Sequence, residues 1–130
     1  MNSENIQQKH AHYGRMPIFE WDESVSMCYG DEETARNLLK VCAEEIESSK
    51  QKIEKHYKCM DAQLLRDELH KVRGGVCYLK IPELEHTLEA FHAVVKESFQ
   101  DKDRLKKAYQ ALENSEERFL EFYNNSDFEK

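Results

Sequence analysis

The chain has 130 residues, with 19 Lys and Arg against 26 Asp and Glu and a formal net charge of -7. A chain of this length buries about two thirds of its surface on folding, which suffices for one hydrophobic core but not for two domains. The acidic balance argues against a nucleic-acid-binding surface, and the 39% hydrophobic content argues against a disordered chain. Only 4 Gly and 2 Pro occur, too few for the turns of an all-β fold, so we expect an all-α domain.

We expect neither a secretory signal nor a membrane span in this sequence. Residues 1–15 are polar and aperiodic, and no segment approaches the ~18 apolar residues of a membrane span. We expect a flexible N-terminal arm over 1–15, a helical bundle over 16–125 and a frayed tail over 126–130. The four cysteines are widely spaced, as in a cytoplasmic protein with free thiols: Cys28, Cys42, Cys59 and Cys77.

A short helix and a long helix are expected first. The apolar patch over residues 18–27 predicts a short helix that Asp22 can cap. Gly30 is a break, and Asp31 is a helix cap followed by acidic residues that suit a helix N-terminus. Apolar residues then recur at helical spacing up to about Lys58, which predicts a helix of about 40 Å.

Three further helices complete the expected fold. Asp61 can cap the first, Pro82 suits the first turn of the second, and residues 100–103 precede the last. Such amphipathic helices with short connections predict an antiparallel up-and-down four-helix bundle with an extra short N-terminal helix. The three apolar seams are Leu65, Leu69, Val72, Val76 and Leu79; Leu84, Leu88, Phe91 and Val95; and Leu105, Ala108, Leu112, Phe119 and Phe122.

Two adjacent glycines interrupt one of these seams. Gly74 and Gly75 lie between Val72 and Val76, and each glycine inside a helix costs about 1 kcal/mol relative to Ala. Val76 and Leu79 continue the apolar helical spacing beyond the two glycines. We therefore interpret the pair as a bare spot, a patch of helix surface without side chains, on a continuous helix rather than as the end of the helix.

A histidine lies beside this bare spot on a helical wheel. His70 falls off the core face one turn before Gly74, and Arg66, Arg73 and Cys77 fall on the neighbouring stripe. An accessible imidazole with free space beside it and fixed positive charge within reach suits a phosphoryl group on a ring nitrogen. The alternative, which is the commoner case, is a solvated surface histidine next to arginines.

The segment His70-Lys71-Val72-Arg73-Gly74-Gly75 resembles the core motif of histidine-containing phosphotransfer (HPt) domains, whose pattern is His, two residues, Lys or Arg, Gly and small residues. The resemblance spans roughly residues 19–122. It implies that His70 is the phosphoacceptor, that Arg73 stabilises the phosphate and that Gly74 provides steric clearance.

Three positions depart from the family pattern. Arg73 stands where Lys is commoner, which retains the charge but changes its geometry. Gly75 replaces a more usual Ser or Ala, and Lys80 stands where many members have Gly. A non-Gly residue in a left-handed helix cap costs about 1–2 kcal/mol, so we expect the turn before Pro82 to differ from that of the family.

The resemblance implies a phosphorelay protein rather than a kinase. His70 would accept a phosphoryl group from the aspartate of a response-regulator receiver domain and pass it to another receiver, downstream of a hybrid sensor histidine kinase. The chain would need no cofactor, because the receiver would supply Mg²⁺. We expect a free-standing cytoplasmic monomer that contacts neither nucleic acid nor membrane. Its docking face would include Gln63, Arg66, Gly75 and Cys77.

Other interpretations remain open. A degenerate HPt domain could act as a non-catalytic helical adaptor that docks on a receiver or kinase without carrying phosphate, and a structural bundle could have no role in signalling. Glu83-x-x-His86 and Glu89-x-x-His92 match an element of di-iron bundles. That site needs such elements on two helices, whereas both matches lie on one, so no metal site is expected.

Overall fold

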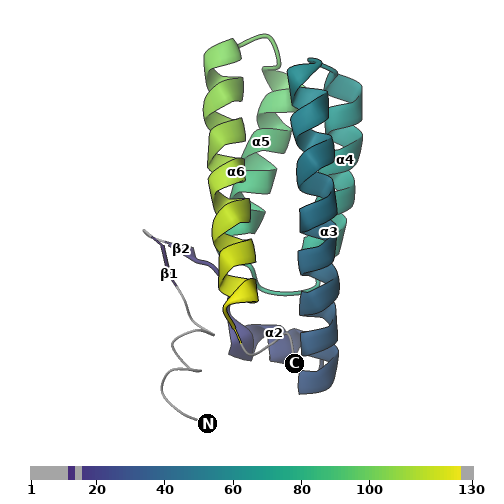
Figure 1. Cartoon of the computed structure of the whole chain (residues 1–130), viewed down its shortest axis with the longest axis vertical. Helices are drawn as coiled ribbons and strands as arrows, with labels where there is room; N and C mark the ends of the chain where they lie inside the picture. Colours follow the sequence, from purple (N-terminus) through teal and green to yellow (C-terminus); the bar gives the residue numbers. More distant parts are fainter. Residues whose placement is uncertain (1–11, 14–15, 127–130) are drawn as a thin grey trace.

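The computed structural model describes residues 12–13 and 16–126, and their fold is an all-α bundle with one short strand pair (Figure 1). The strands β1 (His12–Tyr13) and β2 (Met16–Pro17) pair in antiparallel fashion. The expectations of a flexible arm and a frayed tail lie outside the described residues, apart from β1 and Ser126. The helices are α2 (Trp21–Met27), α3 (Glu32–Lys58), α4 (Ala62–Val76), α5 (Pro82–Glu97) and α6 (Lys102–Asn124).

The helices α3 to α6 form a closed four-helix bundle, which confirms the predicted fold class. Each packs against the next along the chain, and α6 returns to pack against α3. Short connections join consecutive helices, so neighbours run antiparallel. The short helix α2 lies across one end of the bundle, beside the connection between α4 and α5 (Figure 1). None of the helices in the described segments has the length and apolar character needed to cross a membrane.

Side-chain caps start two of the helices as predicted. Asp31 accepts hydrogen bonds from the backbone N–H groups of Glu33 and Thr34, and these bonds lower the pKa of its carboxyl. Asp61 accepts a hydrogen bond from the N–H of Leu64 at 3.0 Å. Both aspartates satisfy N–H groups that the first turn of a helix leaves without partners.

The predicted cap of α2 was wrong. Glu20 is the N-cap residue, so Asp22 lies in the first turn rather than before it. An acidic residue there still interacts favourably with the helix dipole. Pro82 is in the first turn of α5, as predicted.

The apolar seams form one core. Every predicted seam residue of α4 and α5 is buried, and so are those of α6, apart from the half-buried Ala108. Phe19 and Trp21 extend this core at the α2 end, where the Arg36 guanidinium lies 5.2 Å from the centroid of the Trp21 ring. Met27 belongs to the predicted apolar patch but is 44% exposed, because it lies at the end of α2.

The connection between α4 and α5 is tied to α2. The N–H of Lys80 donates to Oγ of the buried Ser24 at 2.9 Å, and the N–H of Glu20 donates to the carbonyl oxygen of Lys80 at 3.0 Å. Among the described residues, the non-glycine residues with positive φ are Tyr29 and Met60. Lys80 therefore needs no left-handed conformation, and the turn differs from a glycine cap, as its sequence implied.

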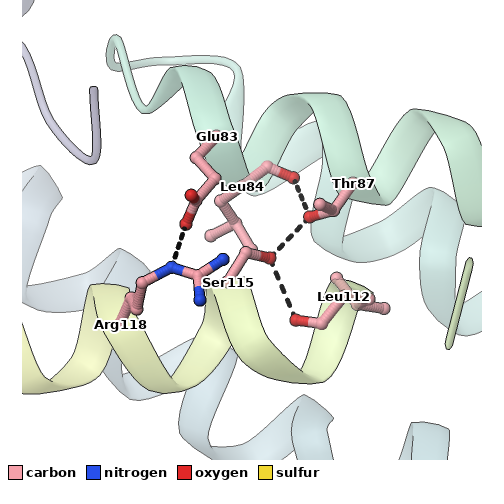
Figure 2. A network of polar contacts seen from close by, with 6 residues as sticks. All are labelled: Glu83, Leu84, Thr87, Leu112, Ser115 and Arg118. Carbon is pink, nitrogen blue, oxygen red and sulfur yellow. Dashed lines mark hydrogen bonds and ion pairs between the residues drawn. The ribbon is translucent and has the colours of Figure 1, made fainter. Parts of the chain in front are cut away.

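Polar contacts join α5 to α6 (Figure 2). The hydroxyls of Thr87 and Ser115 lie 2.6 Å apart, and either one can donate to the other. Arg118 Nε donates to a Glu83 carboxylate oxygen at 2.8 Å. Because both hydroxyls are buried, the contact between them satisfies polar groups that water cannot reach.

One buried carboxyl is incompletely paired. Glu116 on α6 is 1% exposed, and its Oε2 atom has no hydrogen-bond partner among the described residues. Burial raises the pKa of this carboxyl to about 8, although the nearby Lys50 ammonium acts in the opposite direction. The structure therefore favours a neutral Glu116.

Candidate functional site

The histidine singled out from the sequence is exposed on the outer side of α4. His70 lies between the buried residues Leu69 and Val72, which anchor the helix to the core. The helix continues through the two glycines, as predicted, but it ends directly after them at Val76. Leu79 is also buried, but it lies in the turn that follows α4 and not in the helix itself.

The two glycines have different surroundings. A Cβ atom at Gly74 would meet no atom of the surrounding structure within 4 Å, so this side of α4 is open, as the wheel indicated. A Cβ atom at Gly75 would lie 2.6 Å from an oxygen of the Glu45 carboxylate on α3. Gly75 therefore accommodates a side chain of the neighbouring helix, which the sequence did not reveal.

His70 shares a shallow depression between α4 and α5 with residues of both helices. Gln63, Arg66 and His70 were predicted from the sequence, and the depression brings all three together. Asp67, His92 and Lys96 complete the lining. We call this surface, formed by these six residues, the His70 depression.

Arg73 crosses from α4 to α5 instead of extending freely into solvent. Its Nη1 lies 3.3 Å from Nδ1 of His92, and its Nη2 donates to Glu89 Oε1 at 3.4 Å. About a third of the Arg73 side chain is exposed. The predicted phosphate-binding cation is thus held beside the His70 depression by two residues of α5.

His92, like Asp67 and Lys96, lines the depression but was not identified as functional by the sequence analysis. The pKa of the His92 imidazole is lowered. Burial is the largest cause, and the positive charges of Arg73 and Arg66 lower the pKa further. Because a guanidinium can only donate hydrogen bonds, the Nδ1 atom of His92 accepts, and its ring proton is on Nε2. The three-residue spacing from Glu89 to His92 was the available signal, since it places both side chains on one helix face.

Cys77 lies in a second depression, which Arg73 also lines. Arg73, Val76, Cys77, Glu85, Leu88 and Glu89 line it. The Cys77 thiol donates to the carbonyl oxygen of Gly74 at 3.0 Å, and burial raises the pKa of Glu85. Of the predicted docking residues, Gln63 and Arg66 therefore share a surface with His70, whereas Cys77 and Gly75 do not.

The His70 depression is basic, although the chain as a whole is acidic. Arg66 and Lys96 line it and Arg73 lies beside it, although the formal net charge of the protein is -7. Asp67 is the one acidic residue in the lining, and it accepts a hydrogen bond from Gln63 Nε2 at 2.9 Å. Such a surface can attract an anion to the exposed imidazole of His70.

Across the part of the chain that the structure describes, no three His, Cys, Asp or Glu side chains are grouped so that they could hold a metal ion. The four cysteines are free thiols.

Comparison of the chain with models of known families, with curated proteins and with solved structures gives no significant match.

Proposed function

We propose that the protein is a phosphorelay histidine phosphotransfer protein that carries a phosphoryl group on His70. The observation that carries this proposal is an exposed imidazole in a basic depression, with open space on the Gly74 side. The acceptor nitrogen must be approachable in line, and the phosphoryl oxygens need cationic donors nearby. Arg66, Arg73 and Lys96 can provide those donors.

The hydrogen-bond pattern favours His70 over its neighbour as the nucleophile. The unprotonated nitrogen of His92 accepts a hydrogen bond from Arg73, so its lone pair is occupied. Within the described residues, no comparable bond engages the ring of His70. The lone pair of one ring nitrogen of His70 is therefore available to attack phosphorus.

The transfer step requires no further cofactor on this chain. A ring nitrogen of neutral His70 forms a bond to phosphorus while the P–O bond to the aspartyl carboxylate of a receiver breaks. The aspartate leaves as a free carboxylate, and the His70 ring keeps its proton on the other nitrogen. The reverse step would deliver the phosphoryl group to a second receiver, whose carboxylates would hold a Mg²⁺ ion that neutralises charge on the phosphoryl oxygens. Under this proposal the protein acts in the cytoplasm between a hybrid sensor kinase and its response regulators.

The alternative is a non-catalytic adaptor that docks on a receiver without accepting phosphate. The same depression could bind the acidic phosphorylation site of a receiver through Arg66 and Lys96 alone. The open position at Gly74 favours the phosphotransfer protein, because simple docking does not require clearance beside an imidazole.

Transfer from phosphorylated receiver domains separates the two functions. Each member of a receiver panel is phosphorylated with acetyl phosphate, freed of the reagent and mixed with the wild-type chain or with His70→Gln. We expect at least one receiver to lose its phosphate to the wild type, and His70→Gln to bind that receiver without accepting phosphate. Binding with no transfer to the wild type would support the adaptor.

A further inference from the structure

Glu89 and His92 both contact the guanidinium of Arg73. They lie three residues apart on α5, and both reach Arg73 on α4. Glu89 is 68% exposed on its side-chain atoms, so its ion pair with Arg73 is weak and easily exchanged with solvent. His92 is half-buried, so its contact is the better-defined of the two.

The contact with Arg73 leaves His92 with one donor that is still available. Its Nδ1 accepts from Arg73, so its Nε2 carries the ring hydrogen. The His92 ring also lines the depression that contains His70. A neutral imidazole with an N–H donor is a suitable ligand for an anionic oxygen, and it is not itself a nucleophile at that nitrogen.

We propose that His92 is a phosphate-binding residue of this site, which donates from Nε2 to an oxygen of the phosphoryl group on His70 while its Nδ1 keeps Arg73 in place. This inference rests on the proposed function of His70. It assigns to α5 a direct part in holding the phosphoryl group, in addition to the residues that α4 contributes.

The charges around His92 give the proposal a measurable consequence. On α4 it faces Arg66, His70 and Arg73, and on α5 it is close to Glu89 and Lys96. Asp67 also lines the depression. The positive groups, together with burial, lower the pKa of His92 in the unmodified protein. A phosphoryl group on His70 adds negative charge to this surface, so the pKa of His92 should rise on phosphorylation.

Three variants of the full chain test the assignment, with phosphoramidate as the phosphoryl donor. His92→Ala removes the donor, whereas His92→Gln keeps a neutral N–H donor. Glu89→Gln is the matched control, since it removes the other α5 partner of Arg73 and leaves His92 intact. We expect His92→Ala to shorten the lifetime of phosphohistidine about tenfold, because a hydrogen bond to a charged group is lost. His92→Gln should restore most of that lifetime, and Glu89→Gln should not shorten it.

A histidine titration followed by NMR provides an independent readout on the wild-type protein. The His92 signal, assigned by its loss in His92→Gln, should titrate at higher pH after phosphorylation than before. An unchanged titration, or a His92→Ala variant with the wild-type lifetime, would overturn the role of His92 while leaving His70 as the acceptor. Absence of phosphate on His70 in the wild type would overturn the proposed function as well.

Discussion

Nη1 of Arg73 on α4 lies 3.3 Å from Nδ1 of His92 on α5, next to the exposed ring of His70. This contact joins the two helices that form the His70 depression. It also holds the Arg73 guanidinium between α4 and α5. The chemistry proposed for His70 thus depends on the packing of α4 against α5 as well as on the motif within α4.

Replacement of Arg73 should weaken phosphate uptake more than it weakens the fold. Arg73→Ala removes a charged donor, and we expect uptake from phosphoramidate to fall on the order of tenfold to hundredfold. Arg73→Lys keeps the charge but not the two-pronged geometry, so its uptake should be intermediate. The matched control is Lys71→Ala, which removes an exposed cation of the same helix outside the lining of the depression. Equal losses in both variants would show that only the overall charge matters.

Gly74 should tolerate a small side chain but not a long one. A Cβ atom there meets no surrounding atom within 4 Å, so Gly74→Ala should retain uptake and raise helix stability by up to about 1 kcal/mol. Gly74→Gln should fold equally well but obstruct the in-line approach to His70, with uptake reduced roughly tenfold or more. Intact mass after phosphoramidate treatment and circular dichroism measure the two effects. Full uptake by Gly74→Gln would contradict the clearance role of this glycine.

The buried carboxyl of Glu116 should make stability depend on pH. Burial raises its pKa from the usual 4.5 to about 8 in the folded protein, so the folded state binds this proton more tightly. The resulting stabilisation is fully present below about pH 4.5 and is lost as the pH rises through about 8. Glu116→Gln should therefore raise the free energy of unfolding at pH 8 by on the order of 2–4 kcal/mol and change it little at pH 4.5.

Urea denaturation at both pH values measures this difference. The exposed neighbour Glu117 supplies the control variant, Glu117→Gln, which should change stability little at either pH. A Glu116→Gln curve that parallels the wild type across the range would mean that the carboxyl is hydrated or paired in solution.

Ser24 should stabilise the turn that leads into α5. Its buried hydroxyl oxygen accepts from the N–H of Lys80 at 2.9 Å, so Ser24→Ala leaves that donor without its partner. We expect a loss of about 1–3 kcal/mol in the free energy of unfolding, measured by urea denaturation. Ser26→Ala, at an exposed position of the same helix, should be close to neutral. Similar losses of unfolding free energy in the two variants would argue against a stabilising role of the hydrogen bond between Lys80 and Ser24.

The helical framework could be predicted because its signals are local. Asp31 and Asp61 are caps whose hydrogen bonds reach only two or three residues along the chain. The apolar seams repeat at a period that directly indicates the buried face of each helix. Asp22 failed as a cap because Glu20 lies in the cap position, and sequence alone rarely defines a boundary to within two residues.

The site was only partly predictable because two of its lining residues, His92 and Lys96, come from another helix. The wheel located His70, Arg66 and Gly74 on α4, since they share one element. It could not show that His92 reaches Arg73, because that contact depends on how α5 is rotated in the bundle. The close approach of Glu45 to Gly75 and the burial of Glu116 are consequences of tertiary packing in the same way.

The most direct test of the account is phosphorylation of the chain by phosphoramidate, followed by intact mass with His70→Gln in parallel. In this reaction the P–N bond of the reagent breaks, ammonia leaves and a ring nitrogen of histidine forms a bond to phosphorus. We predict one acid-labile phosphate on the wild type, located at His70 by peptide mapping under non-acidic conditions, and none on His70→Gln. No uptake, or uptake on other histidines alone, would contradict the assignment of His70 as the phosphoacceptor.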